Sequence, residues 1–252
     1  MEGYGNATYG DAIAEVYDRW YSTRLDPTAA VSLLAELAGS GPALELGIGT
    51  GRVALPLAAR GVPVSGIDAS QEMVARLRAK PGGADIPVRI GDFADVDVEG
   101  PFSLIYVPFT TLFALESQGE QIRCLKNVAG RLQPGGHFVM DAFVPDPSRF
   151  SNQQSVSVPQ VGLDHVMLDV GRHDPVHQRI ESCHVVISND GARVYPVSVR
   201  YAWPAELDAM AQIAGMELLH RYADYDRSPF QATSARHVSV YRLPDRGAGA
   251  TG

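Results

Sequence analysis

A glycine-rich turn is the part of the sequence best suited to bind a cofactor. Residues 43–51 read Ala-Leu-Glu-Leu-Gly-Ile-Gly-Thr-Gly, so a short apolar run opens directly into three glycines. A strand, a glycine turn and a helix in succession let a ligand lie against bare backbone, with its anionic group facing the positive end of the helix. Asp68 ends the next apolar run, where a carboxylate accepts hydrogen bonds from the two hydroxyls of a ribose. The spacing predicts a cofactor that contains a nucleoside.

The spacing of the glycines separates two classes of cofactor. A dinucleotide fingerprint, Gly-x-Gly-x-x-Gly, would place its third glycine at position 52, which is Arg52. The glycines are instead Gly47, Gly49 and Gly51, with Glu45 at the head of the pattern. In this form the stretch resembles the first motif of the class I S-adenosylmethionine (SAM)-dependent methyltransferases. An acidic residue at that position suits the positive ammonium and sulfonium of SAM and would repel a pyrophosphate.

The resemblance implies which residues would hold SAM. The glycines would lie under its methionine part, with Glu45 near its ammonium. Asp68 would hold the ribose hydroxyls, and Met73 would pack on the adenine. Asp92 ends the third strand and would accept the adenine amino hydrogens, with Phe93 beside it. The full set of expected cofactor-binding residues is Tyr21, Glu45, Gly47, Gly49, Gly51, Asp68, Ala69, Met73, Gly91, Asp92, Phe93 and Val107.

An aromatic stripe near the N-terminus admits two interpretations. Tyr17, Trp20 and Tyr21 recur at helical spacing, and such a stripe is commonly a packing surface. The stretch 17–21 also resembles N-terminal segments of small-molecule methyltransferases that close over SAM and offer a tyrosine hydroxyl to cofactor or substrate. Tyr17 and Tyr21 are four residues apart, so both side chains would lie on one face of the helix.

Methyl transfer from a sulfonium is an in-line displacement, so the protein mainly contributes alignment. A neutral amine acceptor only has to lose its proton, whereas a hydroxyl acceptor benefits from a general base. We expect three candidate catalytic residues: the Tyr17 hydroxyl, Asp141 at the end of the fifth strand, and His165 in a β-rich region. For His165 an exposed strand residue is the alternative. Asp141 is the better placed base, because ligands bind at the carboxyl ends of such strands.

The segment after the fourth strand would face the departing methyl group. We expect the acceptor to be bound by Tyr17, Phe109, Thr110, Phe113 and Arg236. Arg236 or Arg227 would pair with an anionic group of the acceptor, with plain surface charge as the alternative for each. Residues 107–110 read Val-Pro-Phe-Thr, which departs from the Asn/Asp-Pro-Pro-Tyr motif of nucleic-acid and protein amide methyltransferases.

These residues need a scaffold that brings strand ends together. Short apolar runs at about 43–47, 62–68, 88–92, 102–107 and 137–141 predict strands, and helical patterns lie between most of them. Such alternation predicts an α/β fold with a doubly wound, mostly parallel sheet. Further strands near 216–222 and 236–242 would form an antiparallel hairpin at its edge. The whole is a Rossmann-like, seven-stranded sheet.

The pattern divides the chain into four parts. Residues 1–40 form an N-terminal helical lid, and residues 41–145 with 204–243 form the SAM-binding core. Residues 146–203 lack a helical period and hold several β-rich runs, with Asn-Asp-Gly at 189–191 as a hairpin turn. We expect an antiparallel insertion there, which in some relatives of this type is a substrate platform or a dimer interface. Residues 244–252 are rich in Gly and Ala and are expected to be a disordered tail.

Composition limits the partners. A net charge of −8 and no basic face argue against nucleic acid. Cys124 and Cys183 form no metal motif and no disulfide framework, so no metal is expected. The sequence has neither a signal peptide at its start nor an apolar run near the ~20 residues of a membrane span. We therefore expect a cytoplasmic protein that binds a small-molecule acceptor and has no membrane partner, and a homodimer through the insertion is one possibility.

The sequence thus predicts a SAM-dependent methyltransferase that leaves S-adenosylhomocysteine (SAH) as product. Its acceptor would be a nitrogen or oxygen of a small secondary metabolite, since the layout resembles actinobacterial methyltransferases of amino sugars and peptide amino termini. Two alternatives stay open at this point. One is a nicotinamide-dependent oxidoreductase, and the other is a methyltransferase-fold protein that binds SAM without methylating, as a cyclase or a binding module.

Overall fold

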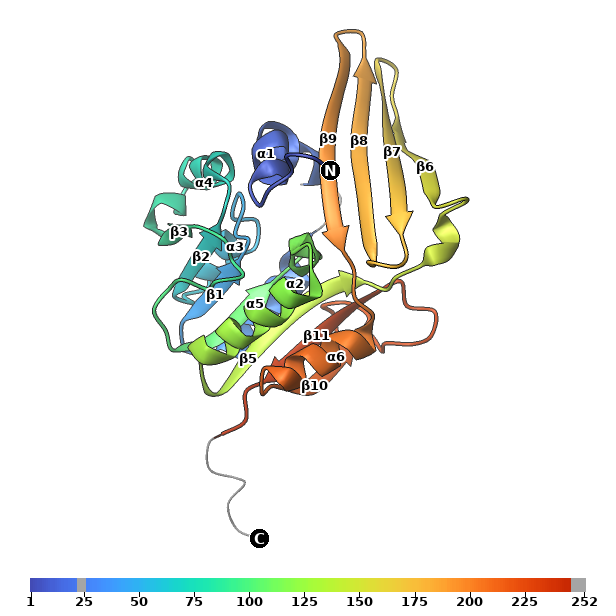
Figure 1. The fold of residues 1–252 in the computed structure, drawn as a ribbon. Helices are drawn as coiled ribbons and strands as arrows, with labels where there is room; N and C mark the ends of the chain where they lie inside the picture. The colour runs from blue at the N-terminus through green and yellow to red at the C-terminus, as the bar shows by residue number, and fades with distance from the viewer. Residues whose placement is uncertain (22–25, 246–252) are drawn as a thin grey trace.

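A seven-stranded sheet forms the centre of the protein (Figure 1). The computed structural model describes residues 1–21 and 26–245. The strand order is β10-β11-β5-β4-β1-β2-β3, with β1 parallel to β2 and β4. β11 runs antiparallel between β5 and β10, so the predicted mostly parallel sheet with a final antiparallel hairpin is confirmed. The strands are β1 (Ala43–Leu46), β2 (Val64–Asp68), β3 (Val88–Ile90), β4 (Phe102–Val107), β5 (Leu132–Phe143), β10 (Glu217–Tyr222) and β11 (Arg236–Arg242).

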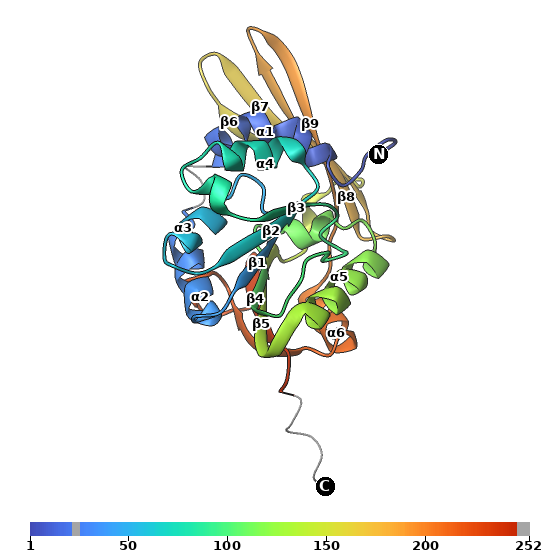
Figure 2. The ribbon, with the colours of Figure 1, turned by 90° about the vertical axis from the view of Figure 1, so that its left-hand side faces the viewer.

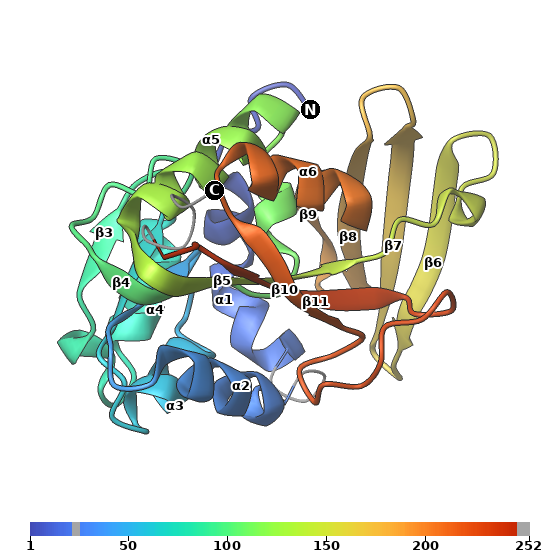
Figure 3. The ribbon, with the colours of Figure 1, turned by 90° about the horizontal axis from the view of Figure 1, so that it is seen from below.

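Helices cover both faces of this sheet (Figures 2 and 3). One face carries α2 (Thr28–Ala38) and α3 (Ala54–Ala58), and the other carries α5 (Gln118–Arg131) and α6 (Pro204–Ile213). β4 is buried along its whole length because its side chains pack alternately into the two layers. The remaining helix at this sheet, α4 (Gln71–Arg78), follows β2, and short 3₁₀ turns lie at Gly83–Asp85, Thr111–Ala114 and Pro147–Arg149.

Local capping explains where the helices begin. The Ser70 hydroxyl accepts a hydrogen bond from the Met73 backbone N–H (3.1 Å) at the start of α4. At α2 the N-cap is Pro27, and the carboxylate of Asp26, one residue earlier, accepts a hydrogen bond from the Thr28 N–H at 2.9 Å.

β5 begins earlier than expected. The strand was predicted to begin at about 137, after the Pro-Gly-Gly of residues 134–136, but α5 ends at Arg131 and β5 starts at Leu132. The Gly135 N–H donates to the Leu243 carbonyl (2.9 Å), so pairing with the chain after β11 draws the glycines into the strand.

The insertion is a separate four-stranded antiparallel sheet. Its strands are β6 (Gln154–Val161), β7 (His165–Asp174), β8 (Arg179–Ser188) and β9 (Gly191–Arg200), in that order. Ser188 pairs with Gly191, which confirms the two-residue hairpin at Asn189-Asp190. Helix α1 (Thr8–Tyr21) lies between this sheet and the core and contacts β9 and α4 (Figure 1).

This arrangement gathers chemically useful residues at one edge. The parallel strands β1 to β5 end on the same side of the sheet, where the glycine turn, Asp68, Asp92 and Asp141 follow or close them. Across the described ranges, no helix is both long and apolar enough to span a membrane. Most of the tail predicted from 244 onward lies outside the described residues.

Candidate active site

The glycine turn exposes bare backbone beside the loop that follows β4. The Gly47 and Ile48 N–H groups both donate to the Ile67 carbonyl (2.8 and 3.0 Å), which ties the turn to β2. Gly47 has a φ of +70°, and a Cβ placed on it would lie 2.6 Å from the Thr111 methyl carbon. A side chain at Gly47 would therefore be strained and would fill the space beside Thr111.

Asp68 is fixed as a pair of acceptor oxygens. One oxygen accepts from the Gly49 N–H (2.7 Å) and the other from the Ser70 N–H (2.8 Å). Each oxygen keeps a second acceptor position. Burial raises the pKa of this carboxyl above its ordinary value. Two oriented oxygens at a strand end suit the two neighbouring hydroxyls of a ribose.

A cavity opens in front of these residues, and we call it the glycine-turn cavity. Of the expected cofactor residues, it is lined by Gly47, Gly49, Asp68, Ala69, Met73, Asp92 and Phe93. Asp92 is held by the Ala94 N–H (2.9 Å) and by Arg123 (3.1 Å). The wall combines two carboxylates with the apolar surfaces of Met73 and Phe93, which is the chemistry that an adenosine requires.

Other expected cofactor residues lie behind this wall. Glu45 is only 2% exposed, and its carboxyl accepts a hydrogen bond from the Tyr106 hydroxyl at 2.9 Å. Burial raises the pKa of Glu45 to about 8. Gly51 packs against α4, where a Cβ would meet Leu77 at 2.3 Å, and Val107 is buried in the core. Gly91 also lines neither the glycine-turn cavity nor the cavity next to it.

Helix α1 covers the glycine-turn cavity and is held there by hydrogen bonds and an ion pair to neighbouring segments. Asp18 accepts from the Thr50 hydroxyl (2.6 Å) and forms an ion pair with Lys80 (2.8 Å). Asp11 accepts from the Ser70 hydroxyl at 2.6 Å. The N-terminal helix is thus joined by polar contacts to the glycine turn and to the start of α4.

A second cavity adjoins the first, and we call it the Arg52 cavity. It is lined by Tyr9, Tyr17, Tyr21, Arg52, Phe109, Thr110, Thr111, Asp141, Ala142, Phe143 and Arg236. Tyr9, Tyr17 and Thr111 also line the glycine-turn cavity. The two cavities therefore meet at these side chains, so ligands in them would lie next to each other.

Asp141 shapes the wall of the Arg52 cavity. Phe109 and Thr110 have φ angles of +59° and +65°, a left-handed conformation that is uncommon outside glycine. One Asp141 oxygen accepts from the Phe109 N–H (2.7 Å) and from the Tyr225 hydroxyl (2.6 Å), and the Asp141 carbonyl accepts from the Thr110 N–H (3.1 Å). The buried carboxylate thus holds the strained segment in place.

The remaining oxygen of Asp141 faces Arg236 at 3.3 Å. Arg236 also lies 3.4 Å from Asp224, so two carboxylates share its charge. Arg227 pairs with Glu36 on α2 instead and lines neither cavity. Phe113 is fully buried and packs edge-on against Phe143 (5.3 Å between ring centroids), so it supports the wall from behind.

The aromatic stripe on α1 divides between the two interpretations. Tyr17 lines both cavities and Tyr21 lines the Arg52 cavity, with their rings 4.8 Å apart. Trp20 packs edge-on against Tyr195 of the insertion (4.8 Å), which is structural packing. Burial raises the pKa of Tyr17 to about 12, so its hydroxyl stays protonated at neutral pH.

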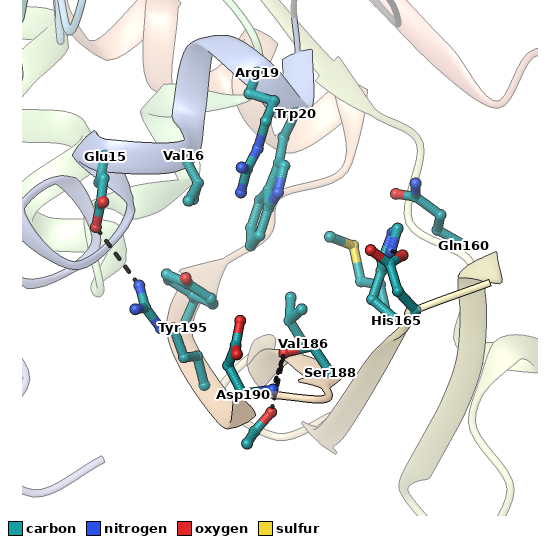
Figure 4. Close-up of a pocket in the computed structure, with 14 residues that line it drawn as sticks. Glu15, Val16, Arg19, Trp20, Gln160, His165, Val186, Ser188, Asp190 and Tyr195 are labelled. Atoms are coloured by element: carbon teal, nitrogen blue, oxygen red, sulfur yellow. Dashed lines mark hydrogen bonds and ion pairs between the residues drawn. The ribbon is translucent and has the colours of Figure 1, made fainter. Parts of the chain in front are cut away.

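His165 is not brought to either cavity. It lies in a groove between α1 and the insertion, together with Trp20 and Tyr195 (Figure 4). Its ring nitrogen Nδ1 is 2.8 Å from Asp164. The α1 residues that line this groove are not the α1 residues that line the two cavities, so the groove is separate from them. The structure therefore gives no support to His165 as a catalytic base.

Sequence reasoning missed Tyr9, Tyr225 and the cavity role of Arg52. Tyr9 lies eight residues before Tyr17, close to two helical turns, so extending the stripe backwards would have found it. Tyr225 approaches from the β10–β11 connection and had no local pattern to reveal it. In the described part of the chain, no group of three or more His, Cys, Asp and Glu side chains could hold a metal.

Known proteins that are similar to this chain are methyltransferases. The family described as "methyltransferase domain" matches residues 43–136. The cypemycin N-terminal methyltransferase of Streptomyces sp is 30% identical over 243 residues, which cover 93% of this chain and 97% of that protein. The structure of the CcbJ methyltransferase from Streptomyces caelestis matches with a TM-score of 0.90 and 41% identity, over 96% of this chain and 100% of that one.

A SAM-bound structure shares the fold at greater distance. CalS10, an amino pentose methyltransferase from Micromonospora echinaspora, matches with a TM-score of 0.66 and 22% identity, over 90% of this chain and 96% of that chain. These similarities support the prediction of a methyltransferase. They give no support to a nicotinamide-dependent oxidoreductase.

Proposed function

This chain belongs to the SAM-dependent methyltransferases, and we propose that it transfers the methyl group of SAM to a nitrogen of a small secondary-metabolite acceptor. The observation that carries the proposal is the junction of the two cavities at Tyr9, Tyr17 and Thr111. The glycine-turn cavity has the lining expected of the SAM site. The Arg52 cavity would then hold the acceptor.

Bound SAM supplies an electrophilic methyl group on its sulfonium. Asp68 would hold the ribose hydroxyls, while Met73 and Phe93 would enclose the adenine, so that the methyl group is presented at the junction of the cavities. Closure by α1 would exclude water from that junction. The protein's main contribution is alignment, because a displacement of this kind needs the acceptor atom held in line with the bond that breaks.

Nitrogen is favoured over oxygen because none of the described residues that line the Arg52 cavity is available as a strong base. One oxygen of Asp141 is occupied by Phe109 and Tyr225, and the other faces Arg236. The Tyr17 hydroxyl stays protonated, since its pKa is raised to about 12. A neutral amine attacks without prior deprotonation, whereas an alcohol acceptor would need a base here. The name of the cypemycin enzyme, which refers to an amino terminus, agrees with an amine acceptor.

Cofactor binding and product analysis test the proposal together. SAM and SAH should raise the melting temperature, and NAD(P) should leave it unchanged. Incubation with SAM and a panel of amino sugars, amino acids and short peptides should then yield SAH and an N-methylated product by mass spectrometry. Tight SAH binding without turnover of any amine, combined with turnover of a phenol or alcohol, would contradict the choice of nitrogen. Binding without any methylated product would favour the non-methylating alternative.

We also propose that the insertion joins two copies of the chain. On the face of this sheet turned away from α1, apolar residues pair across strands: Val156 with Val170, Leu168 with Val185, and Val185 with Val194. Val156 and Val194 are 71% and 57% exposed. A continuous exposed apolar face of this kind is typical of an interface.

Light scattering after size exclusion tests this homodimer. Val194→Lys should convert a dimer to a monomer, because it places a charge inside the apolar face. Val176→Lys is the matched control, since Val176 is 82% exposed in the turn between β7 and β8 and lies off that face. A monomeric wild type, or a dimer that survives Val194→Lys, would contradict the proposal. The cytoplasmic location expected from the sequence stays a prediction.

A further inference from the structure

The Arg52 side chain is enclosed by aromatic rings at the centre of the proposed acceptor site. Its guanidinium carbon lies 3.7 Å from the centre of the Phe109 ring and 5.5 and 5.6 Å from those of Tyr17 and Tyr21. Rings that stack on a guanidinium cover its flat faces and leave its N–H edges free to donate. The enclosure therefore orients Arg52 through the faces of its guanidinium group and leaves the N–H edges for hydrogen bonds.

Among the described residues those donors have only distant partners. The two terminal nitrogens reach the Tyr17 hydroxyl at 3.3 Å and the Tyr21 carbonyl at 3.4 Å, both long for hydrogen bonds. The Nε atom is buried and has no hydrogen-bond partner among the described residues. Buried donors are normally paired, so this side chain has hydrogen-bonding capacity that the described residues do not use.

No carboxylate among the described residues forms an ion pair with Arg52. Within residues 1–21 and 26–245, no Asp or Glu lies at ion-pair distance from it. Asp18 is engaged by Lys80 and Thr50, and Asp141 faces Arg236. Glu45 lies behind the turn, where burial raises its pKa to about 8 and keeps it largely uncharged at neutral pH. Asp18 and Glu45 thus act on Arg52 only through space, and the guanidinium has no direct ion-pair partner among the described residues.

We propose that Arg52 binds an anionic oxygen group of the acceptor, so that the acceptor is an amine that also carries a carboxylate or a phosphate. This inference rests on the proposed function, because it takes the Arg52 cavity as the acceptor site. The planar guanidinium matches the paired oxygens of either group. Arg52 lines this cavity and does not line the glycine-turn cavity, which favours the acceptor over the carboxylate of SAM as the source of the anion. Binding there would hold the amine near Tyr9 and Tyr17, where the cavities meet.

Titration of the SAH-loaded protein with benzoate and benzamide tests the anion site. The two probes have the same shape and aromatic ring, but only benzoate is charged. Benzoate should bind about tenfold or more tightly than benzamide, because a charge-assisted hydrogen bond is strong in a partly buried site. Phenyl phosphate in the same titration shows which of the two anions fits better. Equal affinity for benzoate, phenyl phosphate and benzamide would overturn the proposal.

Variants assign the preference to a residue. Arg52→Gln should remove the preference for benzoate over benzamide. Arg52→Lys should keep part of this preference, because lysine retains the positive charge but lacks the planar set of N–H donors of a guanidinium group. Arg60→Gln is the matched control, since Arg60 contacts Ser32 outside both cavities. Loss of the preference in Arg236→Gln but not in Arg52→Gln would overturn the assignment. If Arg52→Gln fails to fold, a preference that is unchanged in Arg52→Lys and lost in Arg236→Gln would overturn the assignment.

Two further measurements separate this inference from neighbouring ones. If Arg52→Gln weakens SAH binding about tenfold and leaves the benzoate preference unchanged, the arginine serves the cofactor and the proposal is wrong. Methyl transfer is measured separately on the wild type with the amine panel. A wild type that prefers benzoate but methylates no amine refutes the proposed function and leaves the anion site standing. A wild type that methylates an amine but binds benzoate and benzamide equally supports the proposed function and refutes the anion site.

Discussion

Replacing Glu45 by Gln should remove a large pH dependence from the unfolding free energy. The Glu45 carboxyl is 2% exposed, and its burial raises its pKa from the ordinary 4.5 to about 8. Between these two values the folded state keeps the proton while the unfolded state releases it. The stabilising contribution of the protonated form is therefore complete below pH 4.5 and is lost as the pH rises through about 8.

The size of the effect follows from the shift. One proton held only by the folded state changes the unfolding free energy by about 1.4 kcal/mol per pH unit. From about pH 5 to about pH 8 the contribution of Glu45 should fall by roughly 3 kcal/mol. His237 acts in the opposite sense at lower pH, because burial lowers its pKa to about 4. Both proteins contain His237, so its contribution cancels when Glu45→Gln is compared with the wild type.

Urea unfolding followed by circular dichroism at several pH values measures the two slopes. The wild type should lose stability more steeply than Glu45→Gln as the pH rises, whatever their difference at pH 5. Glu36→Gln is the control, since Glu36 is an exposed residue that pairs with Arg227 on the surface, and it should keep the wild-type slope. Equal slopes for the wild type and Glu45→Gln would show that Glu45 is ionised in the folded protein, which would refute the reasoning from burial.

Three other changes test the two cavities. Asp68→Ala should weaken SAH binding by about 1–3 kcal/mol through the loss of charge-assisted hydrogen bonds, and an unchanged calorimetric affinity would remove the ribose assignment. Tyr17→Phe should lower kcat without changing the shape of its pH profile from about pH 6 to about pH 9, because the pKa of Tyr17 is raised to about 12; loss of an inflection in that range would make Tyr17 a base after all. Asp141→Ala should lower the unfolding free energy by about 2–4 kcal/mol, since the Phe109 N–H and the Tyr225 hydroxyl lose their shared acceptor. Its SAH affinity should stay close to that of the wild type, and an unchanged melting temperature would speak against Asp141 as the support of the strained loop.

The fold was predictable because its determinants are local. Buried parallel strands show as short apolar runs, and Ser70, Asp26 and Asn189-Asp190 mark helix starts and a hairpin by their own chemistry. The start of β5 was misplaced because its residues 134–136 are strand only through pairing with the chain after β11, about a hundred residues away. A proline and two glycines in a row indicate a break unless a distant partner is known.

In the cofactor half of the site, too, the sequence predicted what depends on local pattern and strand order but not what depends on a distant contact. Asp68 and Asp92 end neighbouring strands, and parallel strands end at one edge, so their meeting in one cavity follows from topology. Glu45 lies two residues before the glycine turn, still within β1, and its side chain lies beside Tyr106 of the adjacent strand β4. Membership of a motif therefore gave the neighbourhood of Glu45 but not the direction of its side chain.

The acceptor half had no spacing to reveal it, because its wall comes from five separate stretches of chain. Tyr9 and Tyr17 come from α1, Arg52 from the glycine turn, Phe109 from the loop after β4, Asp141 from β5 and Arg236 from β11. Only the first two share a helix, and no periodic pattern connects the others. The conformation of Phe109 depends on Asp141, and the ring of Phe109 in turn lies on Arg52. A change in the length or conformation of the loop after β4 would therefore alter the acceptor pocket while leaving Asp68 and the glycine turn intact, so acceptor choice can diverge on this scaffold without loss of SAM binding.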